Sequence, residues 1–220
     1  MIPKFKDFIN EGLWTKGVDR SKTGDKRKES VDTCLDFVDM GECGKWATCN
    51  VGAKSPEEVG LFFAWGETEG EETDKQKLWG DYKFSIDNDG DRFTKYNKED
   101  KLKILEPEDD AAHVHMGGKW RMPTIQEFQK LCELCDYSWE KNYNNTKVQG
   151  MLFKLKTDKS KNLFFPSFTY TRGNFWGSYW SSSRVWDYPY AYKLNFYNVH
   201  IDDDMYKKRN FRYNVRGILD

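Results

Sequence analysis

The chain predicts an α+β fold in which small antiparallel sheets combine with two helices and long loops. Four short runs of strand-forming residues, each bounded by turn residues, recur after Lys147. They cover 153–156, 163–165, 192–196 and 214–218. Two other segments carry the residues that begin helices. The stretch 71–103 is charged and lacks apolar periodicity, so we expect a long loop there, with one short strand around Tyr82 and Phe84.

Both expected helices begin with a capping pattern. Ser55 precedes a proline and, three residues on, Glu58, while Thr124 precedes Glu127 at the same spacing. In such a pattern the two side chains accept hydrogen bonds from backbone N–H groups of the first turn. In the second helix four apolar side chains fall on one face, which we expect to pack on a sheet or core. They are Ile125, Phe128, Leu131 and Cys135.

Length and charge limit the classes of protein to which this chain can belong. With 220 residues, 38% of them hydrophobic and 16% aromatic, the chain can build one main domain, which we place at 31–220. The formal charge of −1, from 35 basic and 36 acidic residues, provides no global field to attract nucleic acid or an anionic membrane. No window reaches the roughly 18 consecutive apolar residues of a membrane-spanning helix. We therefore expect neither a nucleic-acid partner nor membrane insertion.

Residues 1–30 are predicted to form a basic amphipathic tail. Phe5, Phe8, Ile9 and Leu13 fall at helical spacing before the pattern dissolves into basic residues. The tail is either frayed and solvated or a helix that docks the domain onto a larger assembly or a second copy. Its first ten residues alternate charge with Phe and Ile instead of presenting the apolar stretch of a secretory signal. A virion-associated and an extracellular location both stay open.

The cysteines form an odd set, which does not suit a framework built only of disulfides. They are Cys34, Cys43, Cys49, Cys132 and Cys135. We expect reduced and mostly buried thiols. The C-x-x-C formed by Cys132 and Cys135 could become a zinc site with Cys43 and Cys49, but the apolar helix face needs Cys135 for packing. We therefore expect no zinc.

Six blocks of sequence carry a family resemblance. They are 38–41 (VDMG), 45–53 (KWATCNVGA), 63–68 (FAWGET), 108–112 (EDDAA), 118–124 (GKWRMPT) and 179–183 (YWSSS). In this order they resemble a Bacteroidetes-type paralogous domain, the Fibrobacter succinogenes major paralogous-like family, over roughly residues 38–218. The resemblance implies a C-type-lectin-like fold. The same fold is used by the formylglycine-generating enzymes and by the variable proteins of diversity-generating retroelements.

The resemblance also implies which chemistry to expect. Lectin-like relatives often bind sugar through calcium held by Glu-Pro-Asn or Gln-Pro-Asp and Trp-Asn-Asp words, and this chain contains none of them. The formylglycine enzymes use a reactive cysteine pair in the C-terminal half, whereas no cysteine follows Cys135. We therefore expect no enzyme activity and no cofactor. Four tryptophans flanked by small residues are assigned to the scaffold. They are Trp46, Trp65, Trp120 and Trp180.

The aromatic stretch 179–216 predicts a binding surface rather than a reaction centre, because Tyr and Trp supply rigid amphipathic contact area. The candidate ligand-binding residues are Phe175, Trp176, Arg184, Trp186, Asp187, Tyr188, Tyr190, Asn195, Tyr197, Asn198, His200, Asp202 and Asp203. Such rings can also simply cover a loop-rich domain. Trp186 and Tyr188 decide between these interpretations, because a loop that contains a proline cannot easily bury both rings.

Alternation along the run after Tyr190 predicts which side chains face solvent. Tyr192, Leu194 and Phe196 are expected to face the core. Lys193, Asn195 and Tyr197 are expected to face outward and to extend the binding surface.

Three further groups carry weaker patterns. Asp87, Asp89 and Asp91 alternate like the first ligands of a calcium loop, but the glycine and the glutamate that complete such a loop are missing. His113 and His115 have no serine or cysteine spaced for a triad, so we expect a capping or surface role. Five charged residues are expected to form a network that joins the central helix to the sheet. They are Glu67, Glu108, Asp109, Asp110 and Arg121.

The sequence thus predicts a non-enzymatic protein that recognises a receptor protein or a glycan at a cell surface through a diversified C-terminal surface. The N-terminal pattern favours a phage-borne protein over a secreted bacterial one. The alternative is an assembly subunit in which the same aromatic patch packs against a neighbouring subunit. An enzyme would need Glu67, Asp109 or Asp110 in a cleft with a strongly shifted pKa, and the sequence offers no partner to shift it.

Overall fold

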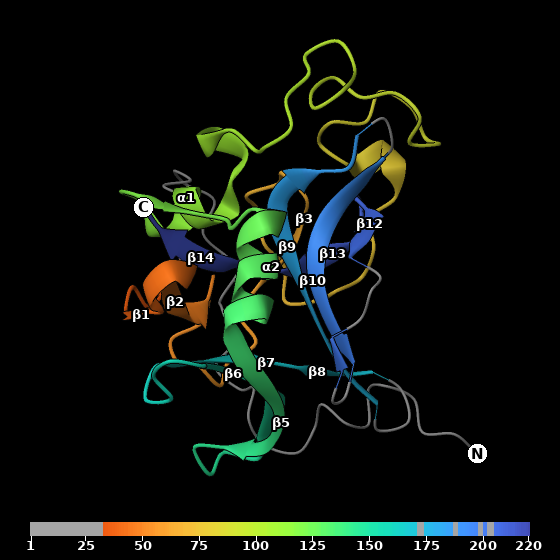
Figure 1. Cartoon of the computed structure of the whole chain (residues 1–220). Coiled ribbons are helices and arrows are strands. Elements are labelled where there is room, and N and C mark those ends of the chain that lie inside the picture. Colours follow the sequence, from red (N-terminus) through yellow and green to blue (C-terminus); the bar gives the residue numbers. More distant parts are fainter. Residues whose placement is uncertain (1–32, 171–173, 187–188, 198–199, 202–204) are drawn as a thin grey trace, which may run out of the picture. The chain divides into compact units, whose positions relative to one another are not determined.

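The computed structural model describes residues 33–170, 174–186, 189–197, 200–201 and 205–220 (Figure 1). The expected tail over 1–30 lies outside these residues. Of the residues that the structure describes, 41% lie in strands and 14% in helices, so the predicted α+β class is confirmed. The helices are α1 (Ala111–Met116), α2 (Ile125–Leu134) and the 3-10 turns η2 (Gly41–Cys43), η3 (Trp79–Asp81) and η4 (Pro107–Asp109).

One sheet joins the first strands of the domain to its last strand. Its strands are β1 (Phe37–Asp39), β2 (Lys45–Asn50), β14 (Arg216–Leu219) and β4 (Trp120–Arg121). They lie in the order β1-β2-β14-β4, and every pair is antiparallel. Because Ile218 lies directly across from Trp46, the end of the chain closes the domain against its beginning.

The central sheet is built around one long hairpin, β9 (Asn174–Arg184) and β10 (Tyr190–Tyr197), which crosses the domain in Figure 1. The full order is β11-β10-β9-β13-β3, with β12 also paired to β10 and β8 to β9. The remaining strands are β3 (Phe62–Ala64), β8 (Phe168–Tyr170), β11 (His200–Ile201), β12 (Tyr206–Lys208) and β13 (Arg212–Asn214). The pairing of β13 with β9 is parallel, and the other pairings are antiparallel.

A third, antiparallel sheet follows helix α2. It contains β5 (Cys135–Tyr143), β6 (Val148–Leu155) and β7 (Asn162–Pro166) in that order. The predicted run 163–165 falls in β7 and 192–196 in β10, and 153–156 falls in β6 except for its last residue. The predicted run 214–218 is divided between β13 and β14, which belong to different sheets.

Helix α2 forms as its sequence predicts. Thr124 accepts a hydrogen bond from the Glu127 backbone N–H, and the Glu127 carboxylate accepts one from the Thr124 backbone N–H. Ile125, Phe128 and Leu131 are buried, and the helix packs on β9 and β10. Cys135 is also buried, but it begins β5 instead of ending the helix.

The helix expected after Ser55 does not form, and that prediction is wrong. The segment is a turn in which the Glu58 N–H donates to the Ser55 carbonyl and the Glu58 carboxylate accepts from the Lys54 N–H. The chain passes here from β2 of the first sheet to β3 of the central sheet, and Gly60 at φ +72° lies in this turn. The short helix α1 was not predicted. It begins at Asp110, whose carboxylate accepts from the His113 N–H.

The central hairpin is covered on both faces, so the alternation predicted for β10 fails in part. Neighbouring Tyr179 and Trp180 belong to two different hydrophobic clusters, and neither is exposed. Lys193 lies across from Trp180 and is buried, and Asn195 is buried where its side-chain oxygen accepts from the Ser178 hydroxyl. The predicted exposure of Lys193 and Asn195 is therefore wrong.

The stretch 71–103 is mostly loop, as predicted, but it is not a solvated insertion. The short strand expected around Tyr82 and Phe84 is replaced by the turn η3 and an isolated bridge between Ser85 and Phe93. Four of its rings join the core: Trp79, Tyr82, Phe84 and Tyr96. The Tyr82 hydroxyl donates to the Trp65 carbonyl at 2.7 Å, which satisfies its polar atom inside that core.

The scaffold tryptophans and the cysteines agree with their predictions. Trp46, Trp65, Trp120 and Trp180 are all buried, and the Trp65 and Trp180 indole N–H groups donate to backbone carbonyls. All five cysteines are free thiols. Cys43, Cys49 and Cys135 are buried, and Cys34 and Cys132 are partly exposed.

Candidate functional site

The candidate residues do not form one patch, because they lie at opposite ends of the β9–β10 hairpin. Trp176 pairs with Tyr197 at one end, and Arg184 pairs with Ala191 at the other. The eight-residue step along β9 corresponds to roughly 25 Å at the usual rise of an extended strand. We name the first the open end and the second the turn end. Asp187, Tyr188, Asn198, Asp202 and Asp203 lie outside the described residues.

At the open end the rings pack mainly on one another. The Trp176 and Tyr197 rings lie 4.5 Å apart between centroids, and Phe175 lies 6.2 Å from Trp139 of β5. Phe175, Trp176 and Tyr197 are half-buried, and His200 is exposed. The Phe175 contact joins the central sheet to the third sheet, and the Trp176 contact lies within the central sheet, so these rings have a packing role.

At the turn end two cations lie against an exposed indole ring. Trp186 is 45% exposed, and the Arg184 guanidinium carbon and the Lys103 ammonium lie 5.0 and 5.6 Å from its centroid. Cations over an indole face are attracted by its quadrupole, which fixes the ring without burying it. The large exposed ring that sequence reasoning expected at position 186 is present.

Arg184 contacts this ring and is itself held by hydrogen bonds to a neighbouring loop. It was predicted to line the surface, but it is buried, and it bonds to the loop before Ile104. Its guanidinium donates to the Asn97 carbonyl at 2.6 Å, and its backbone N–H donates to the Lys103 carbonyl at 2.8 Å. Arg184 therefore ties that loop to the hairpin and places Lys103 beside Trp186.

Strand β12 adds residues to the turn end that sequence reasoning missed. Tyr206 is 49% exposed, and its ring lies edge-on to the half-buried Tyr190 at 5.7 Å. Lys208 lies directly across from Tyr190, and the Lys207 ammonium lies 5.1 Å from the Phe211 ring. The sequence feature that could have indicated these residues is an aromatic residue followed by two lysines.

The aspartates proposed as a calcium loop use their oxygens internally. Both Asp87 oxygens accept hydrogen bonds from the backbone, one of them from the N–H groups of Asp89, Gly90 and Asp91. Gly90 has φ +78°, and a Cβ there would lie 2.2 Å from the Trp79 ring. The loop is thus an aspartate-capped turn packed on Trp79, and Asp87, Asp89 and Asp91 do not gather around a common point in the described structure.

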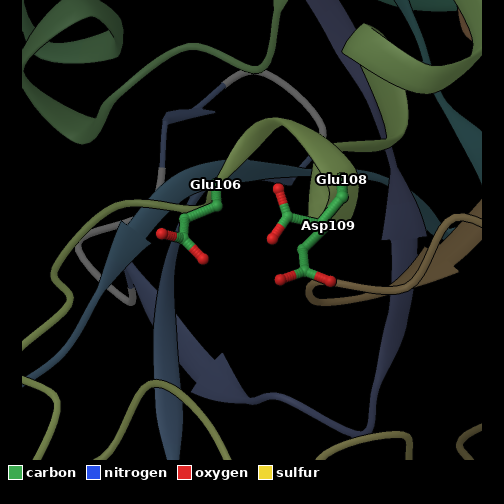
Figure 2. A group of neighbouring side chains, drawn as sticks. All are labelled: Glu106, Glu108 and Asp109. Atoms are coloured by element: carbon green, nitrogen blue, oxygen red, sulfur yellow. The ribbon is translucent and has the colours of Figure 1, made fainter.

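A different acidic group brings three carboxylates together. Glu106, Glu108 and Asp109 point toward one another around η4 (Figure 2). The Lys95 ammonium lies 2.5, 2.9 and 2.6 Å from these three carboxylates, in that order. A cation of the protein itself therefore occupies the position that a metal ion would need.

Asp109 is the buried centre of this group. Its carboxylate accepts from the Lys83 and Lys95 ammonium groups and from the Tyr96 hydroxyl at 2.5, 2.6 and 2.7 Å. Burial raises the pKa of Asp109, but these hydrogen bonds outweigh it and hold the pKa below its ordinary value. Asp109 thus stays ionised and joins the long loop to η4.

The predicted network of five charged residues is divided into separate groups. Glu67 holds the Lys77 ammonium through both carboxylate oxygens, and Arg121 binds Glu127 and Asp220. Asp110 caps α1 and accepts from the Met122 N–H, and burial raises its pKa. Arg121 of β4 thus joins helix α2 to the first sheet through Glu127, but the five predicted residues do not form one network.

A cleft of about 360 Å³ beside α1 contains Asp110, His113 and Ser182, the residue types of a catalytic triad. Their hydrogen bonds are made elsewhere. The His113 ring bonds to the Trp120 carbonyl, the Ser182 hydroxyl donates to the Pro123 carbonyl, and both Asp110 oxygens accept backbone N–H groups. His115 bonds to the Thr68 carbonyl. These contacts assign structural roles to the side chains.

No family model, curated protein or solved structure matches this chain. The likeness to a C-type-lectin-like family consequently rests on the six sequence blocks. In the part of the chain that the structure describes, no helix has the length and hydropathy needed to cross a bilayer.

Proposed function

We propose that this chain is a non-enzymatic ligand-binding protein with a C-type-lectin-like scaffold, and that the turn end of the β9–β10 hairpin is its recognition surface. The observation that carries the proposal is the 45% exposure of Trp186 beside Lys103 and Arg184. Large aromatic side chains that stay exposed on an ordered frame mark contact surfaces. The ligand class is a receptor protein or a glycan at a cell surface.

The strands that carry the turn end are fixed by buried side chains, and this rigidity supports the proposed function. Tyr179 and Trp180 are fully buried on opposite faces of β9, and Arg184 is bound to the neighbouring loop. A ring presented by such a frame loses little conformational freedom when a ligand binds. Recognition can then use Trp186 without ordering the strands that carry it.

The same arrangement supports the proposal that the C-terminal surface is diversified. Val185 and Trp186, the described residues just before the turn, belong to neither hydrophobic cluster, so substitutions there leave the buried tryptophans in place. A reverse-transcriptase gene beside this one, with a near-copy of the segment encoding 179–216 that differs at adenines, would support diversification. If neither the reverse-transcriptase gene nor the near-copy lies beside this gene, the proposal of diversification is wrong.

We expect Trp186→Ala to reduce ligand capture by at least about 30-fold, which corresponds to the 2 kcal/mol of a binding hot spot. The free energy of unfolding should change by less than about 0.5 kcal/mol, because the ring is not part of a core. The measurement is binding of the labelled protein to an array of neutral and acidic glycans and to intact bacterial cells, alongside chemical denaturation.

Tyr137→Ala is the matched control. Tyr137 is also 45% exposed, but it lies on β5, away from the hairpin turn. Its removal should leave capture unchanged. Equal loss in both variants, or capture by neither the wild type nor the variants, would contradict the proposed function. Sedimentation as a stable oligomer that covers Trp186 would favour the assembly subunit instead.

A further inference from the structure

We infer that the turn end recognises an acidic glycan, a sugar chain that carries carboxylate or sulfate groups. This inference rests on the proposed function and names the ligand class for the same surface. It depends on three observations: lysines that form no ion pair within the described residues, exposed aromatic rings at the same end of the hairpin, and an acid of the adjoining loop whose oxygens are already engaged.

The lysines of the turn end differ from those of the core loops in their partners. Lys77, Lys83 and Lys95 each bind a carboxylate at 2.9 Å or less. Lys103, Lys207 and Lys208 form no ion pair within the described part of the chain, and the Lys103 and Lys207 ammonium groups lie 5.6 and 5.1 Å from the Trp186 and Phe211 ring centroids. Their charge is therefore available to an anionic ligand.

Asp100, in the loop that precedes Lys103, does not form an ion pair with these lysines. Asp100 accepts hydrogen bonds from the backbone N–H groups of Tyr96, Asn97 and Leu102. These contacts hold its carboxylate within its own turn. Asp100 therefore forms no ion pair with these lysines, and Asp187 and Asp202–Asp204 lie outside the described residues.

The rings at this end suit a sugar better than a bare anion. Trp186 and Tyr206 present exposed aromatic surface, the Lys103 ammonium lies over the Trp186 ring, and Lys207 and Lys208 follow Tyr206 on β12. A sugar ring can lay its apolar C–H face on an aromatic ring while its acidic substituent reaches an ammonium group. Such binding requires the apolar C–H face and the acidic substituent to lie within one or two monosaccharides of the glycan.

A nucleic acid would fit this surface less well. Single strands bind along continuous positive grooves with successive stacking rings, and their phosphates favour proteins with an excess of basic residues. Here the lysines come from two short segments, the loop at Lys103 and strand β12, on a chain with more acidic than basic residues. The acidic glycan is therefore the class that the charges and rings favour together.

The test measures binding of the full chain to heparin oligosaccharide, polygalacturonate, dextran and a thymidine oligonucleotide by calorimetry. We expect the two acidic glycans to bind and dextran to bind at least about tenfold more weakly. Raising the salt from about 0.1 M to about 1 M shortens the Debye length from about 10 Å to about 3 Å, so acidic-glycan binding should weaken strongly.

The triple variant Lys103→Glu, Lys207→Glu, Lys208→Glu should lose at least about tenfold in affinity for heparin oligosaccharide, and the matching triple Gln variant should lose less. Lys154→Glu, an exposed change on β6, should bind like the wild type. Thermal unfolding of each variant checks that it folds.

Retention of heparin affinity in the folded Glu variant would overturn the inference. So would dextran or the oligonucleotide binding as tightly as the acidic glycans. In either case Trp186-dependent capture of a neutral glycan or of cells would leave the proposed function standing. Capture that does not depend on Trp186 would instead remove the proposed function itself.

Discussion

Replacing Arg216 with leucine is expected to lower the free energy of unfolding by about 3–5 kcal/mol, because it leaves several buried acceptors without a donor. The fully buried guanidinium donates to the Asn50 side chain and to the Ala47 and Phe164 carbonyls, each at 2.9 Å. It also lies 4.6 Å from the Phe165 ring centroid. Chemical denaturation of the purified variant measures the loss.

Arg216 differs from most buried cations in that its partners are carbonyls and an amide. Burial lowers its pKa, but the hydrogen bonds link β14 to β2 and β7. Arg92→Ala is the control, because that side chain is 71% exposed. It should unfold like the wild type. An Arg216→Leu protein as stable as Arg92→Ala would show that this junction is not needed for the fold.

Replacing Asp109 with alanine is expected to cost about 2–4 kcal/mol, because Lys83, Lys95 and the Tyr96 hydroxyl lose their shared buried acceptor. Its exposed counterpart, Asp136, pairs with Lys159 at the surface, so Asp136→Ala should have little effect. If both variants lose the same stability, Asp109 is not the centre of the loop contacts.

The same residue predicts a pH dependence. The pKa of Asp109 in the folded chain lies below its ordinary value, so its contribution is present above about pH 4 and is lost as the pH falls through the folded pKa. The wild type should therefore lose more stability than Asp109→Ala between about pH 5 and about pH 2. Denaturation midpoints across that range measure the difference, and parallel curves would contradict it.

Local patterns predicted the elements that depend on local contacts. The reciprocal cap at Thr124 and the apolar spacing of α2 act within a few residues, so the helix could be read from them. The strands of β6, β7 and β10 were found because each is bounded by turn residues. The buried tryptophans were indicated by the small residues beside them.

The failures all involve contacts between distant segments. Ser55 has the same capping pattern as Thr124, but the connection from β2 to β3 requires a turn there. Lys193 and Asn195 are buried because the central sheet is covered on both faces, and alternation cannot distinguish one covered face from two. The rings of 71–103 lack periodicity because they enter the core from turns.

The candidate site could be predicted only as a set of residue types. Trp186 was singled out because of its place in a loop, and its exposure agrees with that expectation. The sequence did not reveal that β9 separates Trp176 from Trp186, since that depends on the length and pairing of one hairpin. Tyr206 and Lys103 reach the turn end through strand pairing and a loop contact, which carry no local signal.

Hydroxyl-radical footprinting of the unliganded chain, read by mass spectrometry for each ring, tests the central claim most directly. The claim is that a buried tryptophan frame holds an open ring at the hairpin turn. Trp186 and Tyr206 should be oxidised much faster than Trp46, Trp65 and Trp180, which are buried. Protection of Trp186 equal to that of Trp180 would contradict the account.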